Sequence, residues 1–265
     1  MNWRHSLLLL LVVGVVAGIF LFPAIPQNEA YHNFADKRAL VGVSNCLDVL
    51  SNALFLVVGI LGVRFVMDKS PEDRSTFGDP VERWAYLIFF FAVGATAIGS
   101  AYYHLRPSDR RLVWDRLPMA IGFLSLVAGV VCERTAPKNG LRYLVLLPVW
   151  GASTVYYWFV TQENGQGDLR PYIIAQFGSM LAIVLLVTLF PPRYTRGKDL
   201  LISLGIYGLA KVFEYFDPLI FRWGGIVSGH TLKHLTAAVS AWWILHMLRL
   251  RAEVSHNALS SYCAE

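Results

Sequence analysis

The sequence predicts an all-α integral membrane protein, with a core of seven transmembrane helices and one further helix at the N-terminus. Of its 265 residues, 55% are hydrophobic and 15% are charged, whereas soluble domains usually carry about 25% charged residues. Uncharged runs long enough to cross a bilayer core recur along the whole chain. These runs are apolar on all sides, which excludes the alternating strands of a membrane β-barrel. The same hydrophobicity excludes a soluble two-domain enzyme and a disordered chain.

A spanning helix needs about 20 residues, and eight segments of the chain meet this length. They are 6–25, 45–66, 84–104, 116–133, 142–161, 171–190, 200–217 and 228–249. The first follows Arg4 like the apolar region of a signal peptide, but no small-x-small cleavage site follows it. We therefore expect residues 1–30 to form a retained transmembrane helix, an uncleaved signal anchor. Residues 31–250 would form the seven-helix domain and 251–265 a cytoplasmic tail.

Two further features concern the weakest predicted span and the cysteines. The segment 200–217 is interrupted by Lys211 and Glu214, although their spacing of three residues lets them pair on one helix face. The three cysteines, Cys46, Cys132 and Cys263, are far apart, which indicates neither a disulfide framework nor a cysteine metal site.

The distribution of Lys and Arg predicts the orientation in the membrane. With eight spans both termini lie on one side, and basic residues are more frequent in the connections on that side. The positive-inside rule then predicts that both termini are cytoplasmic. No nucleic-acid-binding motif accompanies the basic net charge of +5. The third span would end at the outer face, where the fourth and the eighth begin.

Polar residues inside the predicted spans are the strongest candidates for function, because ionisable groups in hydrocarbon are costly. Ser100 and His104 end the third span, Asp115 opens the fourth, and His230 and His234 open the eighth. Under the predicted topology all five lie in the outer half of the membrane. Their common depth predicts a single site.

The histidines have the spacing of metal ligands. His230 and His234 are four residues apart, so they lie one turn apart on one helix face and can share a cation. His104 would complete three nitrogen ligands and leave a fourth position open, as in catalytic zinc sites. The alternative is that the pair occurs by chance and is merely solvated at the interface. The whole constellation, and not the pair alone, favours a zinc site.

Hydrolysis is the chemistry that such a site predicts. Zinc lowers the pKa of its bound water to about 7 and polarises a carbonyl group. Asp115 is placed to accept the proton of the water. Ser100 lies one turn from His104 and could donate a hydrogen bond to a developing oxyanion. The alternative for Ser100 is a small helix-packing residue beside Gly94 and Gly99.

A second polar cluster opens the second span. Asn45, Asp48 and Asn52 line one helix face. They are either substrate-binding residues or interhelical hydrogen-bonding residues behind an N-cap at Ser44. A buried Asp48 would need a partner. The candidate partners are Lys211, Glu214 and Lys233.

The motif Ser100-x-x-x-His104, followed by Asp115 and by His230-x-x-x-His234, resembles the motif set of the alkaline ceramidases. These enzymes belong to a superfamily of seven-helix membrane hydrolases that includes the adiponectin receptors. The resemblance covers roughly residues 36–249. It implies that the three histidines hold Zn²⁺, that the aspartate acts on the zinc-bound water, and that the serine assists at the substrate carbonyl. The implied reaction is hydrolysis of a ceramide amide to a sphingoid base and a fatty acid.

The chain departs from that family in two places. The animal enzymes bind calcium through an acidic, tryptophan-containing stretch, where this chain has Tyr31 to Arg38. Calcium (Ca²⁺) dependence is therefore doubtful. They recognise the sphingoid head group through a glutamate where this chain has Asn45. The segment from Tyr31 to Asn52 is more similar to bacterial ceramidase-like members, which implies a bacterial inner-membrane protein whose substrate could be another N-acyl lipid.

Three functional hypotheses follow. The first is an amidohydrolase whose lipid substrate enters from the bilayer. The second is a receptor-like or sensing protein with a structural zinc site and little turnover. The third is a transporter, indicated by Lys211, Glu214, Asp48 and Lys233 within spans, but no paired broken helices or repeated halves support it. The sequence does not define the oligomeric state.

Overall fold

The computed structural model describes residues 3–40, 42–69, 76–135 and 140–254, and these residues form helices and connecting segments without strands. The elements are α1 (Trp3–Phe20), η1 (Glu29–His32), α2 (Cys46–Ser51), α3 (Ala53–Asp68), α4 (Pro80–Leu105), α5 (Asp109–Thr135), α6 (Gly140–Glu163), α7 (Arg170–Ile173), η2 (Ile174–Gly178), α8 (Ser179–Leu189), α9 (Asp199–Tyr215), α10 (Asp217–Gly224) and α11 (Gly229–Leu250). The predicted all-α class is confirmed.

Helices occupy the eight segments that the sequence predicts. Six helical segments of the described chain are long and apolar enough to cross a membrane. They are α1, α2 with α3, α4, α5, α6, and α7 with η2 and α8. The other two predicted spans, α9 and α11, do not reach this standard. α9 has 17 residues and contains Lys211 and Glu214, and α11 contains two of the candidate ligands together with Lys233.

Three local features were not predicted. α10 is a short extra helix between α9 and α11. η2 is a π-helical turn within the sixth predicted span. The second predicted span begins with Asn45 in the left-handed conformation, with φ of 48°, so that Asn45 and not Ser44 is the residue before α2. The predicted N-cap at Ser44 is therefore wrong.

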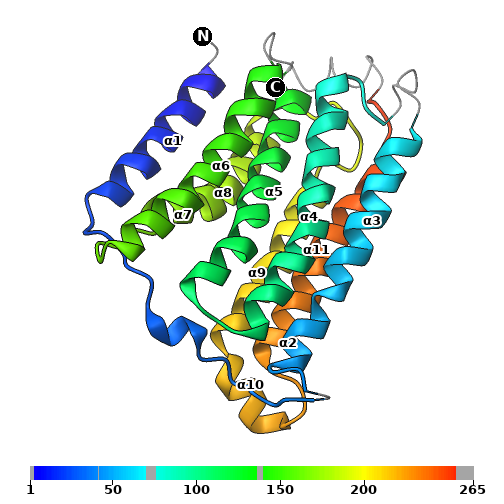
Figure 1. The fold of residues 1–265 in the computed structure, drawn as a ribbon. Helices are drawn as coiled ribbons and strands as arrows, with labels where there is room; N and C mark the ends of the chain where they lie inside the picture. Colours follow the sequence, from blue (N-terminus) through cyan, green and yellow to red (C-terminus); the bar gives the residue numbers. More distant parts are fainter. Residues whose placement is uncertain (1–2, 41, 70–75, 136–139, 255–265) are drawn as a thin grey trace.

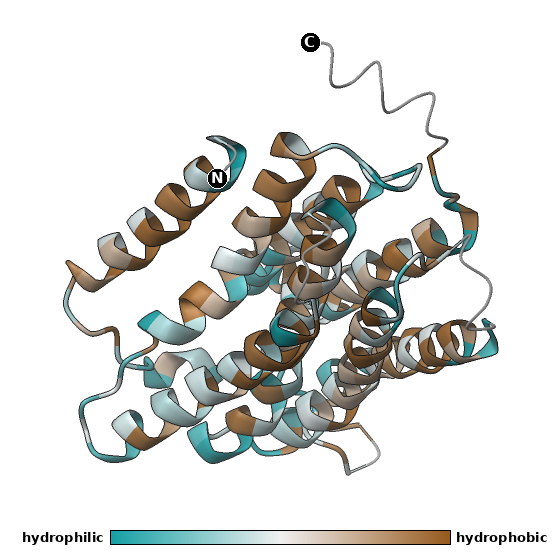
Figure 2. Cartoon of the chain, turned by 90° about the horizontal axis from the view of Figure 1, so that it is seen from above, coloured by the Kyte–Doolittle hydropathy of each residue, from teal (hydrophilic) through white to brown (hydrophobic). Residues whose placement is uncertain are grey.

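The long helices lie side by side in a bundle (Figure 1). α4 packs against α3 and α5, and α9 packs against α11. Close approach is possible where small residues face each other: a Cβ atom on Gly59 of α3 would lie 2.5 Å from the backbone nitrogen of Gly94 in α4. This confirms the expected role of Gly94 in helix packing. The helices are hydrophobic over much of their length, and hydrophilic residues gather in the connections (Figure 2).

α1 is peripheral. It buries none of its residues and contacts α8 and η2 at one side of the bundle (Figure 1). The following residues 21–40, here called the strap, run along the end of the bundle where α2 and α10 lie. Arg38 ties the strap to the loop before α11 by donating to the carbonyl oxygens of Gly225 (3.0 Å) and Ile226 (2.6 Å). The Arg38 guanidinium also holds the pKa of Asp36 below its usual range.

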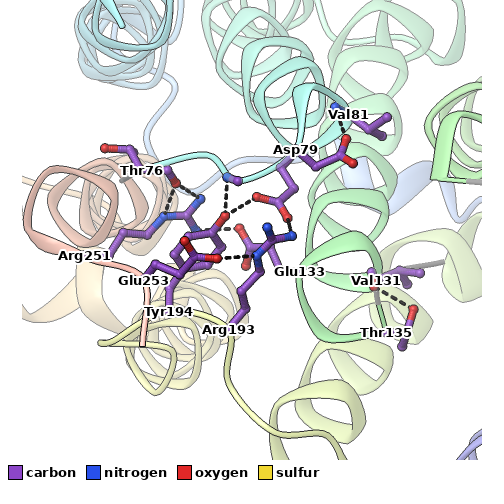
Figure 3. Close-up of polar contacts among 12 residues, drawn as sticks. Thr76, Asp79, Val81, Val131, Glu133, Thr135, Arg193, Tyr194, Arg251 and Glu253 are labelled. Carbon is purple, nitrogen blue, oxygen red and sulfur yellow. Dashed lines mark hydrogen bonds and ion pairs between the residues drawn. The ribbon is translucent and has the colours of Figure 1, made fainter. Parts of the chain in front are cut away.

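The opposite end of the bundle is joined by buried ion pairs (Figure 3). Arg251, just after α11, donates to Glu133 of α5 at 2.5 Å and to the backbone oxygen of Thr76 at 2.7 Å. Its guanidinium lies 4.1 Å from the ring of Tyr194. Tyr194 in turn donates to Glu82 at the start of α4. These contacts connect the ends of α4, α5 and α11, the three helices that carry the candidate site.

Removing one partner of this buried ion pair should destabilise the fold. For Arg251→Met we expect a loss of about 3–5 kcal/mol in the free energy of unfolding, because the Glu133 carboxylate stays buried without its cation. The thermal unfolding midpoint of the detergent-solubilised protein measures this. Arg64→Ala is the matched control, since Arg64 and Asp68 are 79% and 71% exposed, and such pairs contribute about 0–1 kcal/mol. Equal midpoints for the two variants would contradict the structural role of Arg251.

Candidate metal centre

The three predicted ligand histidines meet at one end of the bundle. His104 is in the last turn of α4, and His230 and His234 are in the first two turns of α11. Their ring centroids form a triangle with sides of 4.8, 4.8 and 4.9 Å. One ligand atom of each lies within 4.8 Å of the others, and all three side chains are buried. This group could hold a metal ion.

The hydrogen bonds of the His234 ring suit a role as a metal ligand. Its Nδ1 atom lies 3.1 Å from the backbone oxygen of Asp48 and 2.8 Å from the hydroxyl of Ser51. With Nδ1 as the donor to this carbonyl oxygen, the lone pair lies on Nε2, where it can bind a metal ion. Such second contacts orient the imidazole in many metal sites.

His104 supplies the clearest sign of a missing partner. Its Nδ1 atom is buried and makes no hydrogen bond in the structure. Buried polar atoms are normally paired, so an orphaned imidazole nitrogen next to two further imidazoles indicates a place for a cation. Three neutral nitrogen donors fit Zn²⁺ and similar transition-metal ions better than Ca²⁺, which prefers oxygen ligands.

The strap and its contacts hold the histidines in place. The ring centroid of Phe34 lies 4.5 Å from those of both His104 and His230. Asp217 of α10 accepts hydrogen bonds from the backbone nitrogens of Ala35 (3.0 Å) and His230 (2.8 Å). The strap and the start of α11 are therefore joined through one carboxylate.

Asn45 and Asp48 form hydrogen bonds to the segments that carry the candidate ligand histidines. The Asn45 side chain donates to the backbone oxygen of His104 at 2.8 Å. Asp48 accepts hydrogen bonds from the hydroxyls of Thr231 (2.6 Å) and Ser228 (3.2 Å), the residue before α11. Both side chains are buried among these partners and line neither of the cavities described below.

The predicted charged partners of Asp48 are wrong, because α2 packs against the start of α11 on the side that presents hydroxyl groups. Lys211 and Lys233 instead share Glu214, at 2.7 and 2.6 Å. The predicted pairing of Lys211 with Glu214 is confirmed. The ammonium of Lys233 also lies 3.4 Å from Nε2 of His230. Glu214 is the closer partner, and its charge offsets that of the lysine.

Asp115 and Ser100 lie beside the histidines. Both side chains are buried and line the same cavity. The helices α4 and α5 approach each other closely here. A Cβ atom on Gly99 of α4 would overlap the backbone oxygen of Trp114 in α5. The close packing predicted for Gly99 is confirmed. Ser100 and Asp115 line one cavity together with His234.

This apolar cavity has about 910 Å³ of empty space, open solvent included. Its polar end is formed by Ser100, Asp115, His234 and the two lysines. The remaining lining is mostly apolar. It includes Phe89, Phe123, Leu126, Ala241 and Ile244. From His234 to Ile244 the cavity follows α11 for about 15 Å, at about 1.5 Å per residue.

A second, polar cavity, with about 610 Å³ of empty space, open solvent included, adjoins the same residues. Asp115, Met119, Lys211 and Lys233 line both cavities. The polar cavity is further lined by Arg116 and Tyr172 and, from the π-helical turn η2, by Gln176 and Phe177. The two cavities thus meet at Asp115.

Several residues of this site escaped the sequence analysis. Ser51, Phe34 and Asp217 act through contacts between segments distant in sequence, and no local pattern signals such contacts. The sequence-based prediction gave Arg116 no role, although it directly follows Asp115. Its place in an apolar run after a candidate catalytic residue was a signal that could have singled it out.

Comparisons with models of protein families, with curated proteins and with solved structures find no match. The description of the site therefore rests on its own geometry.

Each histidine of the triangle should be required for metal binding. We expect about one bound transition-metal ion per chain in the wild type, and a loss of most of it in His104→Ala, His230→Ala and His234→Ala. Elemental analysis of the purified protein measures the ion. His246→Ala is the control, because His246 stacks on Trp242 in α11, outside the triangle. Metal that survives in all three variants would place the ion elsewhere.

The close contact at Gly99 should be needed to position Asp115. In Gly99→Ala the added methyl group would push α4 and α5 apart, and overpacking of this kind costs about 1–3 kcal/mol. Gly208→Ala in α9 is the matched control, because nothing lies within 4 Å of its Cβ position and alanine favours a helix. A lower unfolding midpoint for Gly99→Ala, with no decrease for Gly208→Ala, is the expected result. Equal midpoints would show that the helices adjust without cost.

Proposed function

We propose that this protein is a zinc-dependent membrane amidohydrolase that cleaves the N-acyl amide of ceramide or a related N-acyl lipid. The observation that carries the proposal is the buried histidine triangle beside Asp115 and Ser100, at the polar end of a long apolar cavity. The motif resemblance to the alkaline ceramidases supports the same reaction. In this proposal all eight predicted segments cross a bacterial inner membrane, with both termini cytoplasmic and the histidines towards the outer face.

The cavity suits a lipid amide. Its apolar part would bury the acyl chain, and its polar end would place the amide carbonyl beside the histidines. Because the outer faces of the bundle are hydrophobic, with Phe91 and Tyr156 each 70% exposed, the substrate would reach the cavity from the bilayer and not from water.

The side chains present account for the proton transfers of amide hydrolysis. Water adds its oxygen to the carbonyl carbon, and Asp115 would accept the proton that this oxygen loses. The same carboxyl would return the proton to the amide nitrogen as the carbon–nitrogen bond breaks, so that a fatty acid and an amine leave. Ser100 would stabilise the oxygen of the carbonyl by its hydrogen bond. A zinc ion held by the three histidines would supply the Lewis acidity that activates water and carbonyl near neutral pH.

Asp115→Asn should separate catalysis from metal binding. We expect fatty-acid release from N-acyl lipids to fall by about 10²–10⁴-fold, which is the usual contribution of a positioned acid–base group. The bound zinc and the unfolding midpoint should stay close to those of the wild type. The measurement is fatty-acid release by the purified protein in detergent, before and after a chelator and after zinc is restored.

A wild type that holds its zinc and releases no fatty acid from any N-acyl lipid would contradict the proposal. It would favour the receptor-like hypothesis, in which the zinc site is structural. Substrate-driven uptake into liposomes by Asp115→Asn would instead favour a transporter.

A further inference from the structure

The polar cavity contains a buried cation with an unused hydrogen-bond donor. Arg116 is 6% exposed, and its Nη1 atom has no partner. The other end of the guanidinium is held, because Nη2 donates to the side-chain oxygen of Gln27 at 2.6 Å. The rings of Trp158 and Tyr172 lie 4.3 and 4.9 Å from its central carbon. The guanidinium is therefore positioned in advance, with one donor left over.

The charges around the cavity do not balance. Lys211 and Lys233 share the single carboxylate of Glu214, and Asp115 is the one acidic residue among those that line the cavity. Among the described residues no carboxylate forms an ion pair with Arg116, whose contacts are an amide and aromatic rings. A cation buried without a counter-ion is costly, and an anionic group in this cavity would remove that cost.

The polar cavity lies beside the proposed reaction centre, so the anionic group would be part of the substrate. The two cavities share Asp115, which the proposed function places at the amide. With the acyl chain in the apolar cavity, the groups on the nitrogen side of the amide would extend into the polar cavity, towards Arg116.

We propose that the polar cavity binds an acidic group, a carboxylate or a phosphate, on the amine portion of the N-acyl lipid. This inference rests on the proposed function and narrows its substrate class: the preferred substrate carries a negative charge on the nitrogen side of the amide, unlike a neutral ceramide. Arg116, which lines the polar cavity, is then a specificity residue whose charge attracts the acidic group.

The test uses three lipids with the same acyl chain. N-palmitoylglycine carries a carboxylate, N-palmitoylphosphoethanolamine carries a phosphate, and N-palmitoylethanolamine is neutral. Each is given to the full-length wild type and to Arg116→Gln, Arg116→Lys and Arg110→Gln. Arg110 is the matched control, because it lies in the same helix but is exposed and pairs with Glu163 on the surface. Zinc content and unfolding midpoint establish that each variant is folded.

We expect the wild type and Arg110→Gln to hydrolyse at least one acidic lipid with a kcat/KM about tenfold or more above that for the neutral lipid. Arg116→Gln should lose this preference, chiefly through a higher KM for the acidic lipid. Arg116→Lys should retain part of the preference. The two acidic lipids decide between carboxylate and phosphate. A neutral lipid that is hydrolysed as well as both acidic lipids would overturn the inference and leave the proposed function intact.

A binding measurement keeps the two proposals separate. If no lipid is hydrolysed, the shift of the unfolding midpoint by each lipid is compared. A larger shift by an acidic lipid in the wild type and Arg110→Gln, absent in Arg116→Gln, would support the anion site even though the proposed function fails. Equal shifts by acidic and neutral lipids in all variants would overturn the inference.

Discussion

The structure depends on one constraint: a polar group buried in an apolar helix bundle needs a partner, because leaving it unpaired costs about 1–3 kcal/mol or more. The constraint explains why His234 donates to the Asp48 backbone and why Asn45 donates to the His104 backbone. The same constraint makes the buried groups that remain unpaired informative. Six buried side-chain atoms of the described residues have no hydrogen-bond partner, and two of them, Nδ1 of His104 and Nη1 of Arg116, belong to residues beside which the proposed chemistry places a ligand.

The candidate metal centre is built from helix ends, which makes its geometry depend on contacts between helices. His104 ends α4, while Asp115 and His230 lie near the starts of α5 and α11. A helix end can shift unless its neighbours hold it. Here the backbones of α4 and α5 meet at Gly99, and Asp217 binds both the strap and the start of α11. At the far end, Arg251 joins α11 to α5. The long helices therefore connect two fixed ends.

The sequence predicted the helices and the histidine triangle because both depend on local or strongly biased patterns. Hydrophobic runs locate the helices, and polar residues at a common depth locate the site. What it could not predict were contacts that depend on which face of a helix meets its neighbour. The charged partners expected for Asp48 were wrong, since two hydroxyls of the α11 start meet it instead. The cavities escaped prediction for the same reason, because their walls come from residues spread from η1 to α11.

The two cavities differ in polarity, which bears on how a substrate would be oriented at the site. Asp115 lies where an apolar cavity and a polar cavity meet, so an amide held there has chemically different surroundings on its two sides. An acyl chain would be stabilised by entering the apolar cavity. A negatively charged group would be stabilised only beside Arg116, in the polar cavity. A substrate bound the wrong way round would leave a charge in hydrocarbon and a chain beside buried cations. For the proposed lipid amide, these surroundings would favour the acyl chain in the apolar cavity and the amine portion in the polar cavity.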